Sequence, residues 1–127
     1  MTSFVLMTYL CAGTSAAMAL TQCGKASWYA LTSQTASGEM ADPTSFNAAH
    51  RTLPFGTKVK VTNLHNGRTT IVSVNDRGPF VKGRIIDVTR AAAKELKFLD
   101  RGVTRVKIEI ADRNYPRSYK ELKHCKN

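Results

Sequence analysis

The sequence contains no apolar run long enough to cross a membrane as a helix, which takes about 20 consecutive apolar residues. A short apolar run, Phe4–Ala12, lies near the start and is followed by the small-x-small sequence Ala17–Ala19. This pattern predicts a secretory signal peptide over residues 1–19, although no Lys or Arg precedes the apolar run. We therefore expect an exported protein without a stable membrane span.

Acidic residues are scarce, with 9 Asp and Glu against 19 Lys and Arg, and the net charge is +10. No charged side chain precedes Lys25, so the whole charge belongs to the expected mature domain. So basic a domain favours an anionic partner, of which nucleic acid is the most frequent. Because export argues against nucleic acid, the remaining interpretations are an acidic cell-wall glycan or a basic surface that serves solubility alone.

Cysteine is also rare, with three residues in the chain. Loss of the signal peptide would remove Cys11 and leave Cys23 and Cys125, an even pair that predicts a disulfide in an oxidising compartment. In the chain-entropy model, closing a loop of about 100 residues stabilises the folded state by roughly 4.7 kcal/mol. The competing interpretation is lipid attachment at Cys23, which Leu20 favours and the bulky Gln22 disfavours. We favour the disulfide.

The few histidines do not form a metal-binding pattern. His50, His65 and His124 lack any ligand spacing, such as two histidines on one helical turn. The cysteines of the mature chain are better used on each other. We expect neither a metal nor a cofactor.

The length is that of one domain, and alternation of apolar and polar residues is typical of strands. Strands are predicted at residues 24–30, around Val59 and Val61, and at residues 68–76, 84–88 and 103–110. Asn66-Gly67 is typical of a two-residue hairpin turn. Residues 31–55 are typical of a long functional loop.

Residues 89–96 favour a short helix. Thr89 is its expected cap, and Ala92, Ala93 and Leu96 form its expected apolar stripe. Several short strands with a single helix favour a small, mainly β, closed barrel.

Three ionisable side chains, Glu39, His50 and Asp76, lie beside Gly, Pro or small residues, where the backbone turns tightly and a polymer can approach. Alternation places Asp76 at the end of the Val72–Val74 face, where partial desolvation would favour the protonated form that a general acid needs. Each candidate has an ordinary structural alternative. These are a turn-capping or salt-bridged aspartate, a solvated glutamate and a buried histidine bonded to backbone.

Aromatic side chains are candidates for sugar contact. Trp28 and Tyr29 are neighbours on a strand and point to opposite faces, so one can pack in the core while the other faces a sugar. Phe55 and Phe80 are expected to be packing residues. Arginine offers a second kind of contact: Arg51, Arg77 and Arg84 could bind carboxylates in fork geometry or pair with neighbouring aspartates.

The segments that hold these candidates, Thr35–Glu39, Ala48–Thr57 and Asn75–Phe80, resemble in this order the rare lipoprotein A family of bacterial cell-wall proteins. The resemblance runs from about Gly24 to Ile110. It implies a six-stranded double-psi β-barrel, shared with expansins, in which a polysaccharide lies in an open groove. It also implies an endolytic transglycosylase that cleaves the β-1,4 bond between N-acetylmuramic acid and N-acetylglucosamine and leaves 1,6-anhydromuramic acid ends.

The resemblance further implies roles for the candidates. Asp76 would be the leading acid/base, Glu39 a second carboxylate and His50 an orienter or relay, with the division between the two carboxylates open. The preferred substrate would be peptidoglycan strands without stem peptides, whose lactyl carboxylates fit the basic charge.

These implications give a single barrel domain over residues 20–127, without a C-terminal glycan-binding repeat domain. The expected setting is the periplasm of a Gram-negative bacterium, with the protein as a monomer, or lipid-anchored if Cys23 is acylated. The alternative function is an expansin-like module that binds cell-wall polysaccharide without cutting it. A nucleic-acid-binding barrel would require that the signal peptide be false.

Overall fold

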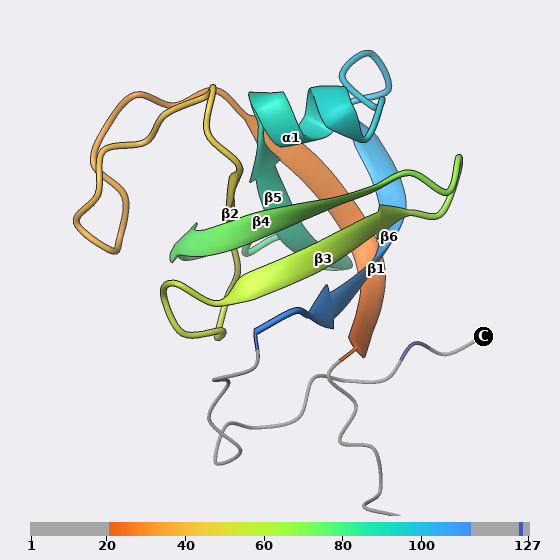
Figure 1. Ribbon diagram of the computed structural model, residues 1–127, viewed down its shortest axis with the longest axis horizontal. Helices are drawn as coiled ribbons and strands as arrows, with labels where there is room; N and C mark the ends of the chain where they lie inside the picture. Colours follow the sequence, from red (N-terminus) through yellow and green to blue (C-terminus); the bar gives the residue numbers. More distant parts are fainter. Residues whose placement is uncertain (1–20, 113–124, 126–127) are drawn as a thin grey trace, which may run out of the picture.

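The predicted strands close into a barrel. The computed structural model describes residues 21–112 and Cys125, and Figure 1 shows the strands wrapped around one core with the helix at one end. In chain order the elements are β1 (Thr21–Tyr29), β2 (Asn47–Ala49), β3 (Lys58–Asn63), β4 (Thr69–Asp76), β5 (Arg84–Thr89), α1 (Arg90–Glu95) and β6 (Val103–Ile110).

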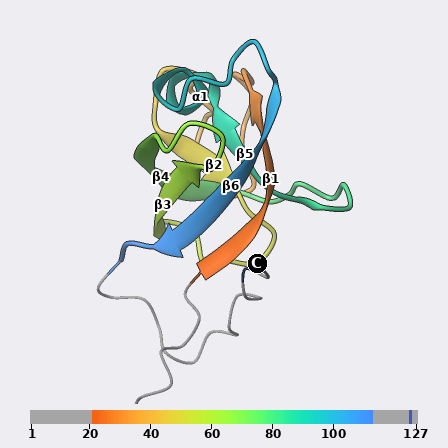
Figure 2. The same ribbon diagram turned by 90° about the vertical axis from the view of Figure 1, so that its right-hand side faces the viewer.

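The order of the strands around the barrel is β1-β5-β2-β4-β3-β6, and β6 pairs again with β1. The β1–β5 and β2–β4 pairs are parallel, and the other four pairs are antiparallel. Closure pairs both edges of each strand, which removes the exposed edges of an open sheet. Figure 2 shows the barrel from the side, with the connection between β4 and β5 extending away from it.

The interior is filled by the inward side of each alternating strand. Its strand residues are mainly β-branched, as suits a pleated surface. They are Ala26, Ala48, Val59, Val61, Val72, Val74, Ile86, Val88, Val106 and Ile108, each at most 1% exposed. The predicted helix stripe is confirmed, since Ala92, Ala93 and Leu96 are fully buried and join this core.

The prediction that the Thr89 side chain caps the helix is wrong. Thr89 lies at the N-cap position of α1 but makes no side-chain capping bond. Its hydroxyl instead donates to the carbonyl of Ser45. Thr89 therefore fastens the β1–β2 connection to the barrel.

β2 corrects the expectation of an uninterrupted loop over residues 31–55. Asn47-Ala-Ala49 has no β-branched or aromatic residue, so local propensity does not indicate a strand. The segment is extended because it pairs with β4 on one side and β5 on the other. Tertiary pairing outweighs propensity here.

The hairpin between β3 and β4 is confirmed, but its turn is longer than the two residues expected. Pairing ends at Thr62 and Thr69. Asn63 accounts for the difference, because its carbonyl accepts from the amides of Asn66 and Gly67. Its side chain accepts from the His65 amide at 3.0 Å, so asparagine bonds build the turn.

Cys23 and Cys125 form the predicted disulfide, with a Cα–Cα distance of 4.7 Å and a sequence separation of 102. A cysteine in a disulfide has no thiol left for a lipid, so the bond argues against acylation of Cys23. The signal peptide expected over residues 1–19 lies outside the described residues. Within residues 21–112, no helix is long and apolar enough to cross a membrane.

Candidate active site

Two aspartates flank one residue of β2. Ala49 pairs with Asp76 of β4 on one side and with Asp87 of β5 on the other. A register shift between Ala48 and Ala49 brings Asp76 opposite Ala49. Because neighbouring strands lie about 4.8 Å apart, the backbones of the two aspartates are roughly 10 Å apart.

Asp76 is held by backbone amides. Its Oδ1 accepts hydrogen bonds from the amides of Ala36 and Arg77, each at 2.9 Å. Both of these bonds fall on the same carboxylate oxygen. The carboxylate is therefore held in place through Oδ1.

Glu39 lies in the β1–β2 connection, which folds over the end of β4. The Ser37 amide donates to the carbonyl of Asn75 at 3.1 Å. The Asn75 side-chain amide in turn donates to Glu39 Oε2 at 3.4 Å. Glu39 is exposed and is tethered to the residue that precedes Asp76. The structure therefore brings Glu39 and Asp76 into one region, as their motifs predicted.

His50 is buried, with 3% of its surface exposed. Its Nδ1 accepts from the amides of Thr52 and Leu53, each at 3.2 Å, and its Nε2 lies 3.0 Å from Gln22 Oε1. A nitrogen that accepts two amide bonds carries no proton, so Nε2 is the protonated nitrogen that donates to Gln22.

The electrostatics of His50 agree with this neutral tautomer. Burial, and then the positive charges of Arg77 and Arg51, lower the pKa of His50 to about 4. The backbone amide of His50 donates to the carbonyl of Asp76 at 3.1 Å. These contacts suit an orienting role, whereas a relay would have to break the bond to Gln22.

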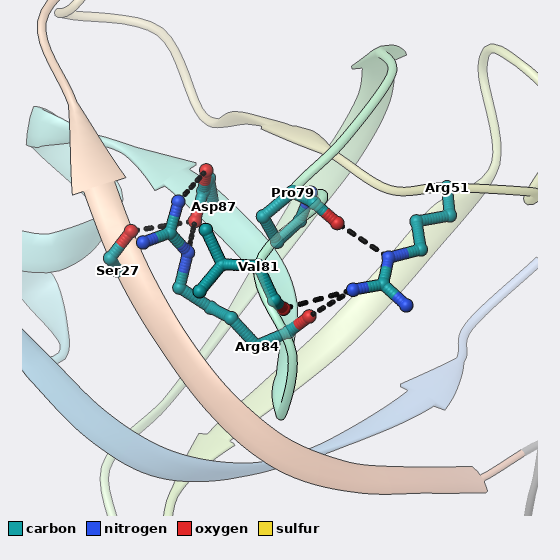
Figure 3. Close-up of polar contacts among 6 residues, drawn as sticks. All are labelled: Ser27, Arg51, Pro79, Val81, Arg84 and Asp87. Carbon is teal, nitrogen blue, oxygen red and sulfur yellow. Dashed lines mark hydrogen bonds and ion pairs between the residues drawn. The ribbon is translucent and has the colours of Figure 1, made fainter.

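Arg51 and Arg84 connect the β4–β5 segment to the site, as Figure 3 shows. Arg51 donates from Nε to the Pro79 carbonyl and from Nη2 to the carbonyls of Val81, at 2.9 Å, and Arg84, at 3.3 Å. Arg84 holds Asp87 through both carboxylate oxygens, with Nε 2.8 Å from Oδ1 and Nη2 3.2 Å from Oδ2.

Arg77 is engaged by the segment that follows β2. Its Nη1 donates to the carbonyls of His50, at 3.3 Å, and Leu53, at 2.8 Å. Its guanidinium also lies 3.9 Å from the centre of the Phe55 ring. All three candidate arginines thus hold protein groups, and Arg84 adopts the aspartate pairing named as its alternative.

The two neighbouring aromatics separate as alternation predicts. Trp28 packs against the core, and its indole N–H donates to the Leu99 carbonyl at 3.1 Å. Tyr29 shares the opposite face of β1 with Ser27, whose hydroxyl donates to Asp87 Oδ1 at 2.6 Å. Tyr29 is therefore the aromatic of this pair on the Asp87 side of the strand.

Phe80 was expected to pack, and this expectation is wrong. It is 79% exposed, and Phe55 is 43% exposed beside Arg77. Phe80 belongs to the β4–β5 connection, which extends away from the barrel (Figure 2). A cavity of about 540 Å³ lies elsewhere, lined by His65, Lys94, Lys97, Leu99, Asp100 and Arg101, and holds none of the candidate residues.

The sequence analysis did not predict Asp87 as a site residue. In β5 it alternates with the buried Ile86 and Val88, so the period-two pattern places it on the outer face. That signal alone does not show that Asp87 lies across Ala49 from Asp76, which depends on the pairing of distant strands.

No cluster of three or more His, Cys, Asp or Glu that could hold a metal occurs in the described part of the chain.

Residues 21–108 match the family model described as "Lytic transglycolase". Among similar curated proteins, "Probable endolytic peptidoglycan transglycosylase RlpA" of Treponema pallidum (strain Nichols) is 54% identical over 94 residues, covering 72% of this chain and 30% of that protein. "Endolytic peptidoglycan transglycosylase RlpA" of Neisseria meningitidis serogroup B (strain ATCC BAA-335 / MC58) is 52% identical over 92 residues, covering 70% and 38%. The chain therefore spans about a third of the length of these relatives.

Two kinds of solved structure are similar to the barrel. The Streptomyces papain inhibitor aligns with a TM-score of 0.62 and 27% identity, over 72% of this chain and 94% of the other. An expansin of Clavibacter michiganensis aligns with a TM-score of 0.60 and 20% identity, over 76% and 52%. Together with the topology, these likenesses confirm the double-psi β-barrel predicted from the sequence.

Proposed function

Because the chain belongs to the lytic transglycolase family, we propose that it cleaves the β-1,4 bond between N-acetylmuramic acid and N-acetylglucosamine in peptidoglycan. The observation that carries this proposal is the geometry of Asp76. Two backbone amides hold Oδ1, and Oδ2 is left to exchange a proton with the substrate.

In the proposed reaction, Asp76 first acts as a general acid. Its proton goes to the glycosidic oxygen as the bond from that oxygen to the anomeric carbon breaks. The resulting carboxylate then takes the proton of the muramoyl 6-hydroxyl while that oxygen bonds to the anomeric carbon. Asp76 regains the proton it gave, and the product carries a 1,6-anhydro ring without consumption of water.

Glu39 supplies the second carboxylate. It lies on the segment bonded to Asn75, where its negative charge can stabilise positive charge that develops on the sugar ring. His50 orients Asp76 through its backbone amide and remains neutral. The roles of the two carboxylates are thereby different, with Asp76 as the proton carrier.

The charge of the domain bears on the substrate. Glycan strands without stem peptides carry free lactyl carboxylates, and a domain of net charge +10 attracts such a polyanion. Stripped strands are therefore the proposed substrate. The arginines named for this contact, Arg51, Arg77 and Arg84, hold protein groups, so the attraction comes from the surface charge as a whole.

The proposed location is the periplasm of a Gram-negative bacterium. The Cys23–Cys125 disulfide supports an oxidising compartment. The proposed species is a monomeric barrel in residues 20–127.

A second candidate is a module that binds polysaccharide without cutting it, since a Clavibacter michiganensis expansin that shares this fold was solved in complex with cellohexaose. Product analysis separates the two. Purified protein is incubated with amidase-stripped glycan, and the ends of the products are identified by mass spectrometry. New 1,6-anhydro ends support the transglycosylase, whereas retention on the glycan without new ends supports the binding module.

A further inference from the structure

The hydroxyl of Tyr29 is a buried hydrogen-bond donor without a partner among the described residues. Nearly all buried polar groups in proteins are hydrogen-bonded, so such an exception needs an explanation. The only other such side-chain atoms in the described part of the chain are Arg84 Nε, which lies 2.8 Å from Asp87, and Asn75 Oδ1. The two atoms that lack any close partner are therefore the Tyr29 hydroxyl and Asn75 Oδ1. Both belong to the candidate site, since Asn75 directly precedes Asp76.

The position of Tyr29 follows from strand pairing. Ser27 pairs with Asp87 across β1 and β5, and Tyr29 follows two residues later on the same face. Asp87 in turn lies across Ala49 from Asp76. The phenol thus lies on the face where the two aspartates flank β2.

Neither carboxylate accepts from the phenol. The oxygens of Asp87 receive Arg84 and Ser27, and the hydrogen bonds to Asp76 fall on Oδ1. Burial, then the charges of Asp76 and Asp87, raise the pKa of Tyr29 to about 12. Tyr29 is therefore a neutral donor at every physiological pH and cannot act as a base there.

We propose that glycan binding displaces the side chains that cover the Tyr29 hydroxyl, so that it donates a hydrogen bond to an oxygen of the sugar bound at the cleaved linkage and positions that sugar between Asp76 and Asp87. The identity of the ligand rests on the proposed function. The role differs from ring stacking, because it belongs to one oxygen atom and not to the aromatic face.

Tyr29→Phe tests this role, since it removes the oxygen and keeps the ring. Binding is measured by titration of stripped glycan oligomers into Asp76→Asn protein, with and without Tyr29→Phe, so that cleavage does not disturb the equilibrium. The dissociation constant should rise about 3- to 10-fold, the range for one neutral hydrogen bond. The melting temperature should stay the same or rise, because no bond within the protein is lost.

Thr104→Val is the matched control, since it removes a buried hydroxyl that donates to Asn63 Oδ1 at 2.9 Å, outside the site. It should lower the melting temperature and leave glycan binding unchanged. An unchanged dissociation constant in the Tyr29→Phe protein overturns the proposal, and so does a fall in its melting temperature, which would show a structural hydroxyl.

Failure of the proposed function gives a different result. In that case wild-type protein forms no anhydro ends, while the binding titration still reports whether the Tyr29 hydroxyl contacts the glycan.

Discussion

The backbone amide of His50 donates to the carbonyl of Asp76 at 3.1 Å, which joins two segments that are 26 residues apart at the point where β4 ends. Arg77 adds a second link, from its guanidinium to the His50 carbonyl. The position of the Asp76 carboxylate therefore depends on the segment after β2 as well as on its own strand.

Asp76→Asn should keep the fold and remove the transferable proton. Cleavage of stripped glycan should fall about 100-fold or more, the usual scale for loss of general acid–base catalysis. Asp100→Asn, which changes an exposed aspartate far along the chain, serves as the control and should cleave normally. Release of anhydro products at the wild-type rate by a folded Asp76→Asn protein would remove Asp76 from its role and leave Glu39 as the better acid.

His50 should stay neutral at neutral pH, because its folded pKa is about 4. Its folded pKa of about 4 lies below the unfolded value of 6.5, so the folded state binds fewer protons. The stabilisation from neutral His50 is complete above pH 6.5 and is lost as the pH falls toward 4, reaching a loss of roughly 3 kcal/mol. NMR titration of the ring protons measures this directly. A midpoint near 6.5 would contradict the buried, neutral ring.

The sequence was sufficient for those features that depend on local pattern. Alternation predicted β3 to β6, and the spacing of Ala92, Ala93 and Leu96 predicted the buried side of α1. β2 was missed because its strand character comes from the neighbours on both sides, and Asn-Ala-Ala carries no signal of its own.

The site likewise combines features that the local sequence predicts with features that depend on distant strands. Gly and Pro near Glu39, His50 and Asp76 marked the segments that meet at the end of β4. The face shared by Tyr29, Asp87 and Asp76 could not be predicted, because it depends on parallel pairing of strands that are distant in sequence. The arginine contacts could not be predicted either. Every residue has a backbone carbonyl, so no sequence pattern marks the carbonyls that an arginine binds.

Reduction of the Cys23–Cys125 bond should destabilise the domain. The bond closes a loop with a sequence separation of 102, and loss of such a native disulfide costs about 2–5 kcal/mol. Urea denaturation of wild-type protein and the Cys23→Ser/Cys125→Ser variant measures the difference. Equal midpoints would show that the barrel does not depend on this bond, and a diacylglycerol mass on Cys23 would show that it does not form.

Binding to stripped glycan should weaken as salt rises, because ions screen the attraction between the basic surface and lactyl carboxylates. Affinity is measured from low to high ionic strength with the Asp76→Asn protein. Peptide-bearing strands provide the comparison and should bind more weakly at low salt. The electrostatic account fails if affinity is independent of salt or favours the peptide-bearing strands.

Arg51→Lys should loosen the β4–β5 segment while preserving the charge. A lysine ammonium cannot reproduce the fork that reaches the carbonyls of Pro79, Val81 and Arg84. Two backbone amides report on the segment. The Arg84 amide donates to the Val81 carbonyl, and the Lys25 amide donates to the Gly83 carbonyl. Their hydrogen exchange should accelerate about 10-fold, the change expected for loss of about 1.4 kcal/mol of local stability.

The same variant tests whether this segment supports the site. Arg84 links the β4–β5 segment to Asp87, because its carbonyl accepts from Arg51 and its guanidinium contacts both Asp87 oxygens. Cleavage by Arg51→Lys should therefore fall together with the protection of the two amides, whereas Arg105→Lys, an exposed change on β6, should alter neither. Unchanged exchange at Arg84 and Lys25 in the Arg51→Lys protein would show that the other bonds of the segment hold it in place without the guanidinium.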